Sequence, residues 1–200
     1  MVIWLTGLSS SGKSTIAQEL KKIMVLCDCS RRVQILDGDV LRNGLCEDLG
    51  FNKIDRDENI RRVRHAAKLL SDNGILVIVA AITPYEEMRY DNRELLGKEY
   101  IEVHVDADIE ECIKRDEKGL YKKAIAGEIE DMTGIGDVYE IPIDPDIICI
   151  TSSEQVHESI KKIIKFVKPR LQTKQKCYKQ REVEIDDSEM MYLDVKLRKM

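Results

Sequence analysis

A glycine-bearing loop near the start of the chain carries the residue types that hold phosphate. Residues 7–15 read GLSSSGKST, which fits the pattern G-x-x-x-x-G-K-[ST]. Backbone N–H groups of such a loop wrap phosphate oxygens, and the helix that follows adds the positive end of its dipole. Lys13 supplies positive charge, and the Ser14 hydroxyl is a hard oxygen ligand suited to Mg²⁺. We predict a nucleotide-phosphate site formed by Gly7, Leu8, Ser9, Ser10, Ser11, Gly12, Lys13, Ser14 and Thr15.

Two carboxylates follow the second predicted strand. Residues 33–36 read VQIL and lead directly into Asp37, Gly38 and Asp39. In open parallel α/β sheets, ligands bind at the carboxyl ends of the strands. A polar turn that caps a helix would explain the same residues, but the phosphate loop favours the functional interpretation. We therefore expect both carboxylates to face the nucleotide site.

The elements that must position these residues alternate between strand and helix. An apolar run at 2–6 precedes the loop, and residues 16–24 place apolar side chains on one helical face. Further strands are predicted at 75–82, 100–105 and 147–150, and helices at 55–72, 86–96 and 154–167, with a short helix and loop at 41–49. Asp55 or Asp57 is expected to cap the helix at 55–72. This alternation predicts an α/β fold with a parallel sheet and helices on both faces.

Two charged segments each have two interpretations. Residues 56–64 contain four arginines near a helix start, where the helix dipole disfavours positive charge. Anion binding would explain them, and so would a solvated face that pairs with Asp57 and Glu58. Residues 115–124 read RDEKGLYKKA, which is typical of a mobile lid in phosphoryl-transfer enzymes, although a solvated helix would look the same.

Composition limits the class of protein further. A chain of 200 residues suits one domain, predicted at 1–167, followed by a charged tail or helical arm at 168–200. A net charge of −5 argues against binding polymeric nucleic acid, and no apolar run suits a membrane span. The six cysteines lack zinc spacing. Cys27-Asp28-Cys29 is interpreted as a helix end, with a metal or redox pair as the alternative. Without a secretion signal, a cytoplasmic location is expected.

Motifs along residues 2–167 resemble the adenylyl-sulfate (APS) kinase family. The loop at 7–15 resembles GLSGSGKST, and LDGD at 36–39 with the residues that follow resembles LDGDNVRHGL. Residues 49–62 resemble LGF…DR.ENIRR, and ITPY at 82–85 stands where ISPY would be. KGLYKKA at 118–124 and TGI at 133–135 resemble the family's KGLYKKA and FTGI. The resemblance implies a three-layer P-loop kinase fold with a parallel sheet, flanking helices and a mobile lid.

The resemblance also implies a reaction. The γ-phosphoryl group of ATP, bound as co-substrate by the loop at 7–15, would pass to the 3′-hydroxyl of APS, giving PAPS and ADP in sulfate assimilation. Mg²⁺ would lie near Ser14 and Asp37. The implied catalytic residues are Lys13, Thr83 and Asp39, and Asp39 takes the hydroxyl proton. The positions that match substrate contacts are Asp37, Asp39, Arg42, Phe51, Arg56, Asn59, Ile82, Lys118 and Met132. Members of the family are usually homodimers.

The chain departs from the family pattern at a few positions. Ser10 replaces the middle glycine of the loop, which is tolerable with a negative φ. Thr83 replaces a serine that has been proposed as a phosphoenzyme site, and direct transfer is the simpler expectation. Val40 and Asn43 replace asparagine and histidine. Met132 replaces a phenylalanine that would form the second face of the adenine clamp, opposite an aromatic ring.

Two other functions stay open at this point. The changes at Val40, Asn43 and Met132 would allow a related kinase with another nucleotide acceptor, such as cytidine diphosphoramidate. The third possibility is a nucleotide-binding module without turnover. Lys13, Ser14 and Asp39 argue against that module, because binding alone does not need a carboxylate beside the phosphates.

Overall fold

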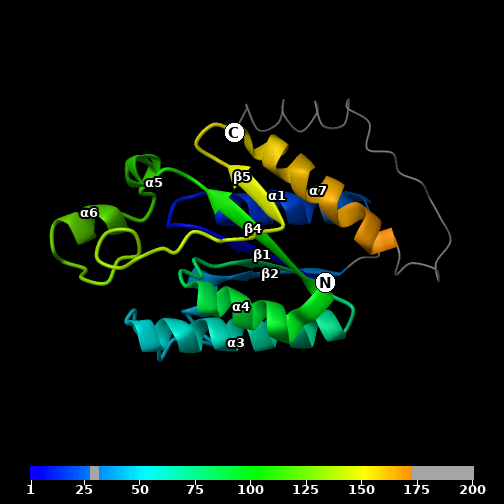
Figure 1. Ribbon diagram of the computed structural model, residues 1–200, viewed down its shortest axis with the longest axis horizontal. Coiled ribbons are helices and arrows are strands. Elements are labelled where there is room, and N and C mark those ends of the chain that lie inside the picture. Colours follow the sequence, from blue (N-terminus) through cyan, green and yellow to red (C-terminus); the bar gives the residue numbers. More distant parts are fainter. Residues whose placement is uncertain (28–31, 173–200) are drawn as a thin grey trace.

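A computed structural model, which describes residues 1–27 and 32–172, has three layers built around one sheet (Figure 1). The sheet contains five strands in the order β2-β3-β1-β4-β5, and its strand pairings are parallel. The strands are β1 (Val2–Thr6), β2 (Val33–Asp37), β3 (Leu76–Ala80), β4 (Tyr100–Asp106) and β5 (Ile147–Ile150). This architecture confirms the predicted parallel α/β fold.

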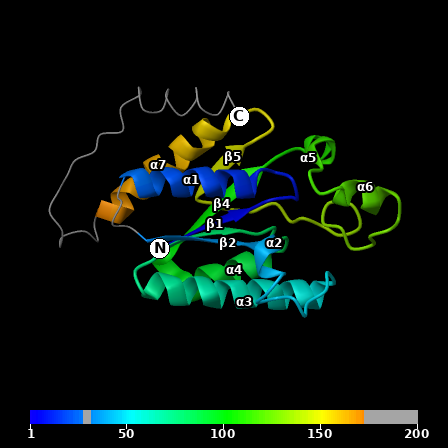
Figure 2. The ribbon, with the colours of Figure 1, turned by 180° about the vertical axis from the view of Figure 1, so that it is seen from behind.

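Helices cover both faces of the sheet, because successive side chains of each strand point to opposite sides. Ile3 and Leu5 of β1 face one apolar layer, and Val2 and Trp4 face the other. The helices lie in two pairs on opposite faces, as the reverse view also shows (Figure 2). One pair is α1 (Lys13–Cys27) with α7 (Val156–Gln172), and the other is α3 (Lys53–Asp72) with α4 (Glu86–Leu96), which the 3₁₀ turn η1 (Gly97–Glu99) joins to β4.

A small third apolar cluster lies beyond the sheet, where the segment interpreted as a lid projects from the body (Figure 1). It involves α5 (Ile109–Arg115), α6 (Leu120–Ile125) and the chain that follows α6. The buried side chains at its centre are Ala107, Cys112, Tyr121, Ala124 and Met132. The segment 115–124 therefore has core positions of its own, which its charged sequence did not predict.

The start of α3 differs from the sequence prediction. The helix begins at Lys53, because the side chain of Asn52 accepts a hydrogen bond from the backbone N–H of Asp55 at 2.9 Å. The prediction that Asp55 or Asp57 caps this helix was therefore wrong. An asparagine in this position satisfies one of the N–H groups that a helix start leaves without a partner.

Other boundaries also shift. The short helix expected within 41–49 is instead α2 (Gly38–Leu41), because the side chain of Asp37 caps it by accepting from the backbone N–H of Asp39 at 3.0 Å. Strand β3 is shorter than the predicted 75–82, and α7 runs beyond the predicted end at 167.

Two sequence interpretations fall outside the described residues. The first concerns Cys27-Asp28-Cys29: Asp28 and Cys29 are not described, so its metal or redox alternative stays a prediction. The second is the arm predicted at 168–200, most of which is also not described. Across residues 1–27 and 32–172, no cluster of three or more His, Cys, Asp or Glu side chains could hold a metal ion. In the same ranges, no helix has the length and apolarity needed to cross a membrane.

Candidate active site

The phosphate loop joins β1 to α1 at the carboxyl edge of the sheet. Gly7 has a φ of +153°, and a Cβ at this position would lie 2.3 Å from the carbonyl oxygen of Val105, so only glycine fits. Lys13 is 8% exposed, and its ammonium donates hydrogen bonds to the carbonyl oxygens of Gly7 at 2.9 Å and Leu8 at 2.6 Å. The local strand, turn and helix thus bring the loop backbone and the Lys13 charge together, as the motif predicts.

Burial changes the acidity of Lys13. Loss of hydration lowers its pKa to about 8, and the nearby ammonium of Lys118 acts in the same direction. The carboxylates of Asp37 and Asp39 oppose this shift by favouring the charged ammonium. Near pH 8, a fraction of the protein without ligand therefore carries a neutral Lys13.

We expect ATP binding to take up protons above pH 8. The phosphates favour the charged ammonium, so they raise the pKa of Lys13, and ATP affinity should fall by up to ~10-fold per pH unit well above pH 8. Calorimetry at pH 8.5 in buffers of different ionisation enthalpy measures this proton uptake, and Lys13→Met is the variant in which it should vanish. Zero uptake in the unmodified protein would contradict the assignment.

Ser14 and Asp37 form a pair of hard oxygen ligands. The Ser14 hydroxyl, in the first turn of α1, donates a hydrogen bond to a carboxylate oxygen of Asp37 at 2.6 Å. Asp37 is the last residue of β2, and Ser14 follows β1. The two groups meet because the parallel strands of the sheet end at the same edge. Mg²⁺ in phosphate sites uses one or two protein oxygens together with phosphate oxygens and water, and this pair fits that requirement.

Asp39 forms an ion pair with Lys118, which lies between α5 and α6. The two residues are far apart in sequence, and the contact places the lid segment over the carboxylate. Both side chains remain about half exposed, so the pair contributes little to stability. The carboxylate expected to receive a proton and the lysine expected to contact substrate therefore lie side by side.

Ser10 differs from the sequence expectation. Its φ is +57°, in the left-handed region, whereas the sequence analysis required a negative angle. The family's glycine would adopt this angle without strain, and a Cβ costs roughly 1–2 kcal/mol there. The Ser10 carbonyl oxygen faces Arg115, whose guanidinium lies 3.4 Å away. The strain is local to the turn that shapes the loop.

Replacing Ser10 with glycine should stabilise the protein. Relief of the left-handed strain outweighs the extra backbone entropy of glycine, giving a net gain of about 0.5–1 kcal/mol in the free energy of unfolding. Thermal unfolding followed by circular dichroism tests this. Ser152→Gly is the control, because Ser152 has no positive φ, and it should be neutral or slightly destabilising. A lower melting temperature for Ser10→Gly would contradict the strain argument.

Helix α3 turns Arg56 and Asn59 inward along the same stripe as Ile60, Val63 and Ala67. Arg56 is 8% exposed and is bound by protein atoms, including the carboxylate of Asp137 at 2.8 Å. The Oδ1 atom of Asn59 is buried and has no hydrogen-bond partner among the described residues. A buried carbonyl oxygen without a partner is costly, so this atom suits a ligand that donates a hydrogen bond.

The remaining arginines of α3 pair with carboxylates. Arg61 and Arg62 both pair with Glu58, and Arg62 also pairs with Asp48. Arg64 donates to Asp91 of α4 at 2.7 Å. The interpretation of a face paired with Glu58 therefore holds for Arg61 and Arg62, whereas the Arg64 side chain, 15% exposed, contacts α4.

Arg42 and Phe51 lie together on the loop between α2 and α3. The Arg42 guanidinium sits 4.3 Å from the centroid of the Phe51 ring and donates hydrogen bonds to the carbonyl oxygens of Leu49 and Gly50. The Phe51 side chain is 60% exposed. Met132, expected to oppose this ring, is 7% exposed and packs within the third apolar cluster. Its side chain therefore does not offer the open face that the sequence analysis expected.

Ile82 and Thr83 follow β3 beneath the phosphate loop. The carbonyl oxygen of Ile82 accepts hydrogen bonds from the Gly7 N–H at 3.3 Å and the Thr6 hydroxyl at 2.6 Å. Thr83 is 1% exposed with a φ of +50°, and its hydroxyl accepts a hydrogen bond from the indole of Trp4 at 2.8 Å. The Thr83 hydroxyl is thus enclosed in the body of the protein.

Some residues at the loop escaped the sequence analysis. Arg115, at the end of α5, donates to the carbonyl oxygen of Thr151 at 2.7 Å, and the Thr151 hydroxyl donates to that of Ser11 at 2.7 Å. The Tyr121 hydroxyl donates to the carbonyl oxygen of Ser9 at 3.1 Å. These contacts hold the phosphate loop from the lid side. The sequence pointed to only two of these residues, Arg115 and Tyr121, because both fall within the segment 115–124 that was interpreted as a lid.

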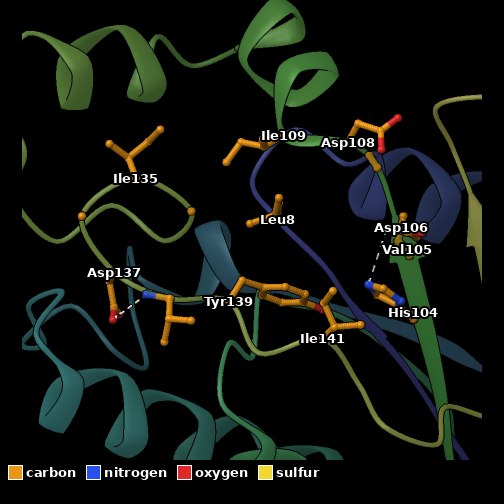
Figure 3. Close-up of a pocket in the computed structure, with 14 residues that line it drawn as sticks. Leu8, His104, Val105, Asp106, Asp108, Ile109, Ile135, Asp137, Tyr139 and Ile141 are labelled. Atoms are coloured by element: carbon orange, nitrogen blue, oxygen red, sulfur yellow. Dashed lines mark hydrogen bonds and ion pairs between the residues drawn. The ribbon is translucent and has the colours of Figure 1, made fainter.

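A cavity of about 590 Å³ adjoins the site (Figure 3). Leu8, Ile109, Ile135 and Tyr139 line it, while His104 and Asp106 stand at its β4 side. Burial lowers the pKa of His104, which stacks on the Tyr139 ring. Of the predicted site residues, only Leu8 lines this cavity, and the other lining residues come from the end of β4, the start of α5 and residues 134–141.

Comparisons with known proteins agree with this geometry. The sequence profile of the adenylylsulphate kinase family matches residues 1–150. The adenylyl-sulfate kinase of Picosynechococcus sp. is 47% identical over 165 residues, which cover 82% of this chain and 92% of that protein. The adenylyl-sulfate kinase of Pseudomonas aeruginosa is 49% identical over 167 residues, which cover 83% of this chain and 84% of that protein. The Mycobacterium tuberculosis APS kinase CysC in complex with AMPPNP and APS superposes with a TM-score of 0.78 and 40% identity over 84% of this chain and 96% of that one. Matched along most of its length, the chain belongs to the adenylylsulphate kinase family.

Proposed function

We propose that the protein transfers the γ-phosphoryl group of ATP to the 3′-hydroxyl of APS, giving PAPS and ADP. The observation that carries this proposal is that two carboxylates lie beside the phosphate loop. The Ser14 hydroxyl contacts Asp37 at 2.6 Å, and the backbone N–H of Asp39 donates to the Asp37 carboxylate. Relatives that are 47–49% identical are named adenylyl-sulfate kinases, and a structural relative holds both AMPPNP and APS. The product would serve sulfate assimilation.

The loop residues and Lys13 bind and orient the phosphates of ATP. Backbone N–H groups of the loop other than those of Gly7 and Ser11, which donate to carbonyl oxygens, would bind phosphate oxygens. The Lys13 ammonium would exchange its carbonyl partners for β- and γ-oxygens. Ser14 and Asp37 would hold Mg²⁺, which when bound neutralises charge on the phosphates. This arrangement supplies charge stabilisation where it develops in the transition state.

Asp39 positions the acceptor hydroxyl and takes its proton as the new bond forms. Its partner Lys118 is then free to contact the acceptor or the transferred group. Thr83 is a poor candidate for a phosphoenzyme, because its hydroxyl is buried against Trp4. We therefore favour direct transfer from ATP to the acceptor, with Thr83 shaping the chain beneath the loop.

The acceptor site lies between the Phe51 loop, helix α3 and the segment near Met132. Phe51 offers an exposed ring for a base, and Asn59 offers a buried acceptor oxygen for a donor on the ligand. The Arg42 guanidinium packs against the Phe51 ring and supplies positive charge beside it. The homodimer and the cytoplasmic location expected from the sequence stay predictions.

The test is ADP release by the purified protein with ATP and Mg²⁺, in three parallel reactions. One contains APS, one contains cytidine diphosphoramidate, and one contains no acceptor. We expect turnover that depends on APS. Turnover only with the cytidine compound would assign the protein to the related kinase activity. That reaction is included because Met132 is buried and does not offer a face to the adenine base. No turnover in any reaction would favour a binding module.

A further inference from the structure

The chain that leaves β3 forms a turn at residues 81–84 between the two halves of the site. Strand β3 lies between β2 and β1 in the sheet, so this turn separates the carboxylates at the end of β2 from the phosphate loop that follows β1. A Cβ at Gly38 would lie 3.4 Å from the carbonyl oxygen of Ala80, which shows that the turn starts directly beside Asp37 and Asp39. A shift of this turn would therefore change the spacing between the phosphate loop and Asp39.

Thr83 has an unfavourable backbone conformation within this turn. Its φ of +50° lies in the left-handed region, where the Cβ atom crowds the backbone and a residue branched at Cβ is an outlier. Residues in such conformations persist only where the surrounding structure imposes them, and they gather at active sites. Contacts from neighbouring elements must therefore hold Thr83 in place.

Three groups in the body of the protein supply these contacts. The indole N–H of Trp4, in β1, donates to the Thr83 hydroxyl at 2.8 Å. The guanidinium of Arg89, in α4, donates to the Thr83 carbonyl oxygen at 2.8 Å. The Thr6 hydroxyl donates to the carbonyl oxygen of Ile82 at 2.6 Å. Hydrogen bonds thus hold the side chain of Thr83 and the carbonyl groups on both sides of its strained φ angle.

Trp4 is the member of this group that holds the side chain of Thr83. Its ring is fully buried in the apolar layer that faces α3 and α4, where it lies 6.1 Å from the ring of Tyr100. The core therefore fixes the direction of the indole N–H. A buried indole N–H without an acceptor is costly, so this bond disfavours any rotation of Thr83 that would break it.

We propose that Trp4 is a positioning residue for phosphoryl transfer, a role that rests on the proposed function. Its hydrogen bond holds Thr83 in the left-handed conformation, and that conformation sets the position of the turn between the phosphate loop and Asp39. Because Trp4 is fully buried, it acts on the reaction through Thr83. The Thr83 hydroxyl thus serves the shape of the turn and takes no part in the chemistry.

Two substitutions of Thr83 separate this role from a chemical role of its hydroxyl. Thr83→Val keeps the branched shape and the strain but removes the acceptor for Trp4, so we expect kcat with APS to fall about 10-fold as the turn shifts. Thr83→Gly also lacks the hydroxyl, but glycine adopts a positive φ without strain, so kcat should fall only about 3-fold. A hydroxyl that reacted or bound substrate would give equal losses in both variants, and equal losses contradict the proposal.

Trp4→Phe tests the other side of the same bond. We expect kcat with APS to fall about 10-fold, while the affinity for ATP in calorimetry stays within roughly 2-fold because the phosphate loop is intact. In the Thr83→Gly background the same substitution should change kcat by less than about 2-fold, since glycine needs no support. A full loss in both backgrounds, or an unchanged kcat in Trp4→Phe alone, overturns the proposal. The Thr83 variants keep the test decisive if Trp4→Phe folds poorly.

Val2→Ala is the matched control for core packing. Val2 is fully buried on the same face of β1 as Trp4 and belongs to the same apolar layer, but it lies at the end of the strand remote from the turn. We expect a lower melting temperature, because buried methyl groups are lost, with kcat and both KM values unchanged at temperatures where the variant is folded. A loss of kcat in Val2→Ala would show that any weakening of this layer lowers turnover, which also overturns the proposal.

The bond can be observed without turnover as well. Trp4 is the only tryptophan of the chain, so its indole N–H gives a single signal of its kind in a ¹⁵N-resolved NMR spectrum. Thr83→Val should move this proton signal upfield, because the hydrogen bond is lost, whereas Thr83→Ser keeps a hydroxyl and should leave it nearly in place. An unmoved signal in Thr83→Val contradicts the proposal. Failure of the proposed function would appear separately, as unmodified protein that does not turn over APS.

Discussion

Replacing Asp39 with asparagine is expected to lower turnover with APS by about 10²–10⁴-fold, the usual contribution of a group that takes a proton in the transition state. The amide keeps the shape of the carboxylate but cannot accept the hydroxyl proton. Asp39 lies after β2, beside the Ser14 and Asp37 pair, and contacts Lys118 from the lid segment. Because that ion pair is about half exposed, its loss should scarcely change stability.

ATP binding gives the contrast that isolates this role. Asp39→Asn should bind ATP with nearly unchanged affinity in calorimetry, since the phosphate loop and Lys13 are intact. The matched control is Asp72→Asn, which alters an exposed aspartate at the far end of α3 that pairs only weakly with Lys68. Its turnover should equal that of the unmodified protein. Near-normal turnover in Asp39→Asn would remove Asp39 from the mechanism.

Replacing Lys13 with methionine should weaken both ATP binding and turnover. The ammonium is buried within the loop, bonded to the carbonyl oxygens of Gly7 and Leu8, where phosphate oxygens would replace these partners. Loss of one such preorganised donor costs about 10²–10³ in kcat, and the loss of a buried positive charge beside the phosphates lowers affinity as well. Methionine fills the apolar part of the site, so the fold should persist.

The two variants are distinguished by ATP affinity, which falls in Lys13→Met and holds in Asp39→Asn. Lys22→Met serves as the control for Lys13, because it removes an exposed lysine from the same helix. We expect normal kinetics for this control. If Lys13→Met bound ATP as tightly as the unmodified protein, the loop would not be the phosphate site.

Much of the fold could be predicted because its signals are local. The phosphate loop occupies contiguous residues, and a strand before it and a helix after it are enough to shape it. Alternating strand and helix segments predicted the parallel sheet, and parallel strands bring Asp37 to the same edge as Ser14. Family motifs then indicated the reaction, and similar proteins that are named adenylyl-sulfate kinases support it.

Helix periodicity also contained a signal that the sequence analysis did not use. Arg56 and Asn59 continue the buried stripe of Ile60, Val63 and Ala67. Arg61 and Arg62 fall outside that stripe, and Arg64 lies at its border. The spacing alone therefore separates Arg56 from its neighbours. It does not identify the partner, because the groups that meet Arg56 come from residues 131–137, roughly 75–81 positions further along the chain.

The sequence by itself determined the phosphate loop, the carboxylates beside it and the family, because each depends on residues close together in the chain. Only the tertiary structure decided that Ser10 adopts a positive φ, that Met132 packs into the lid's own apolar cluster, and that Arg56 is held by Asp137. Each of these outcomes depends on which distant segment supplies the neighbouring atoms. Composition and periodicity specify the face that a side chain occupies, whereas chain topology specifies what it meets there.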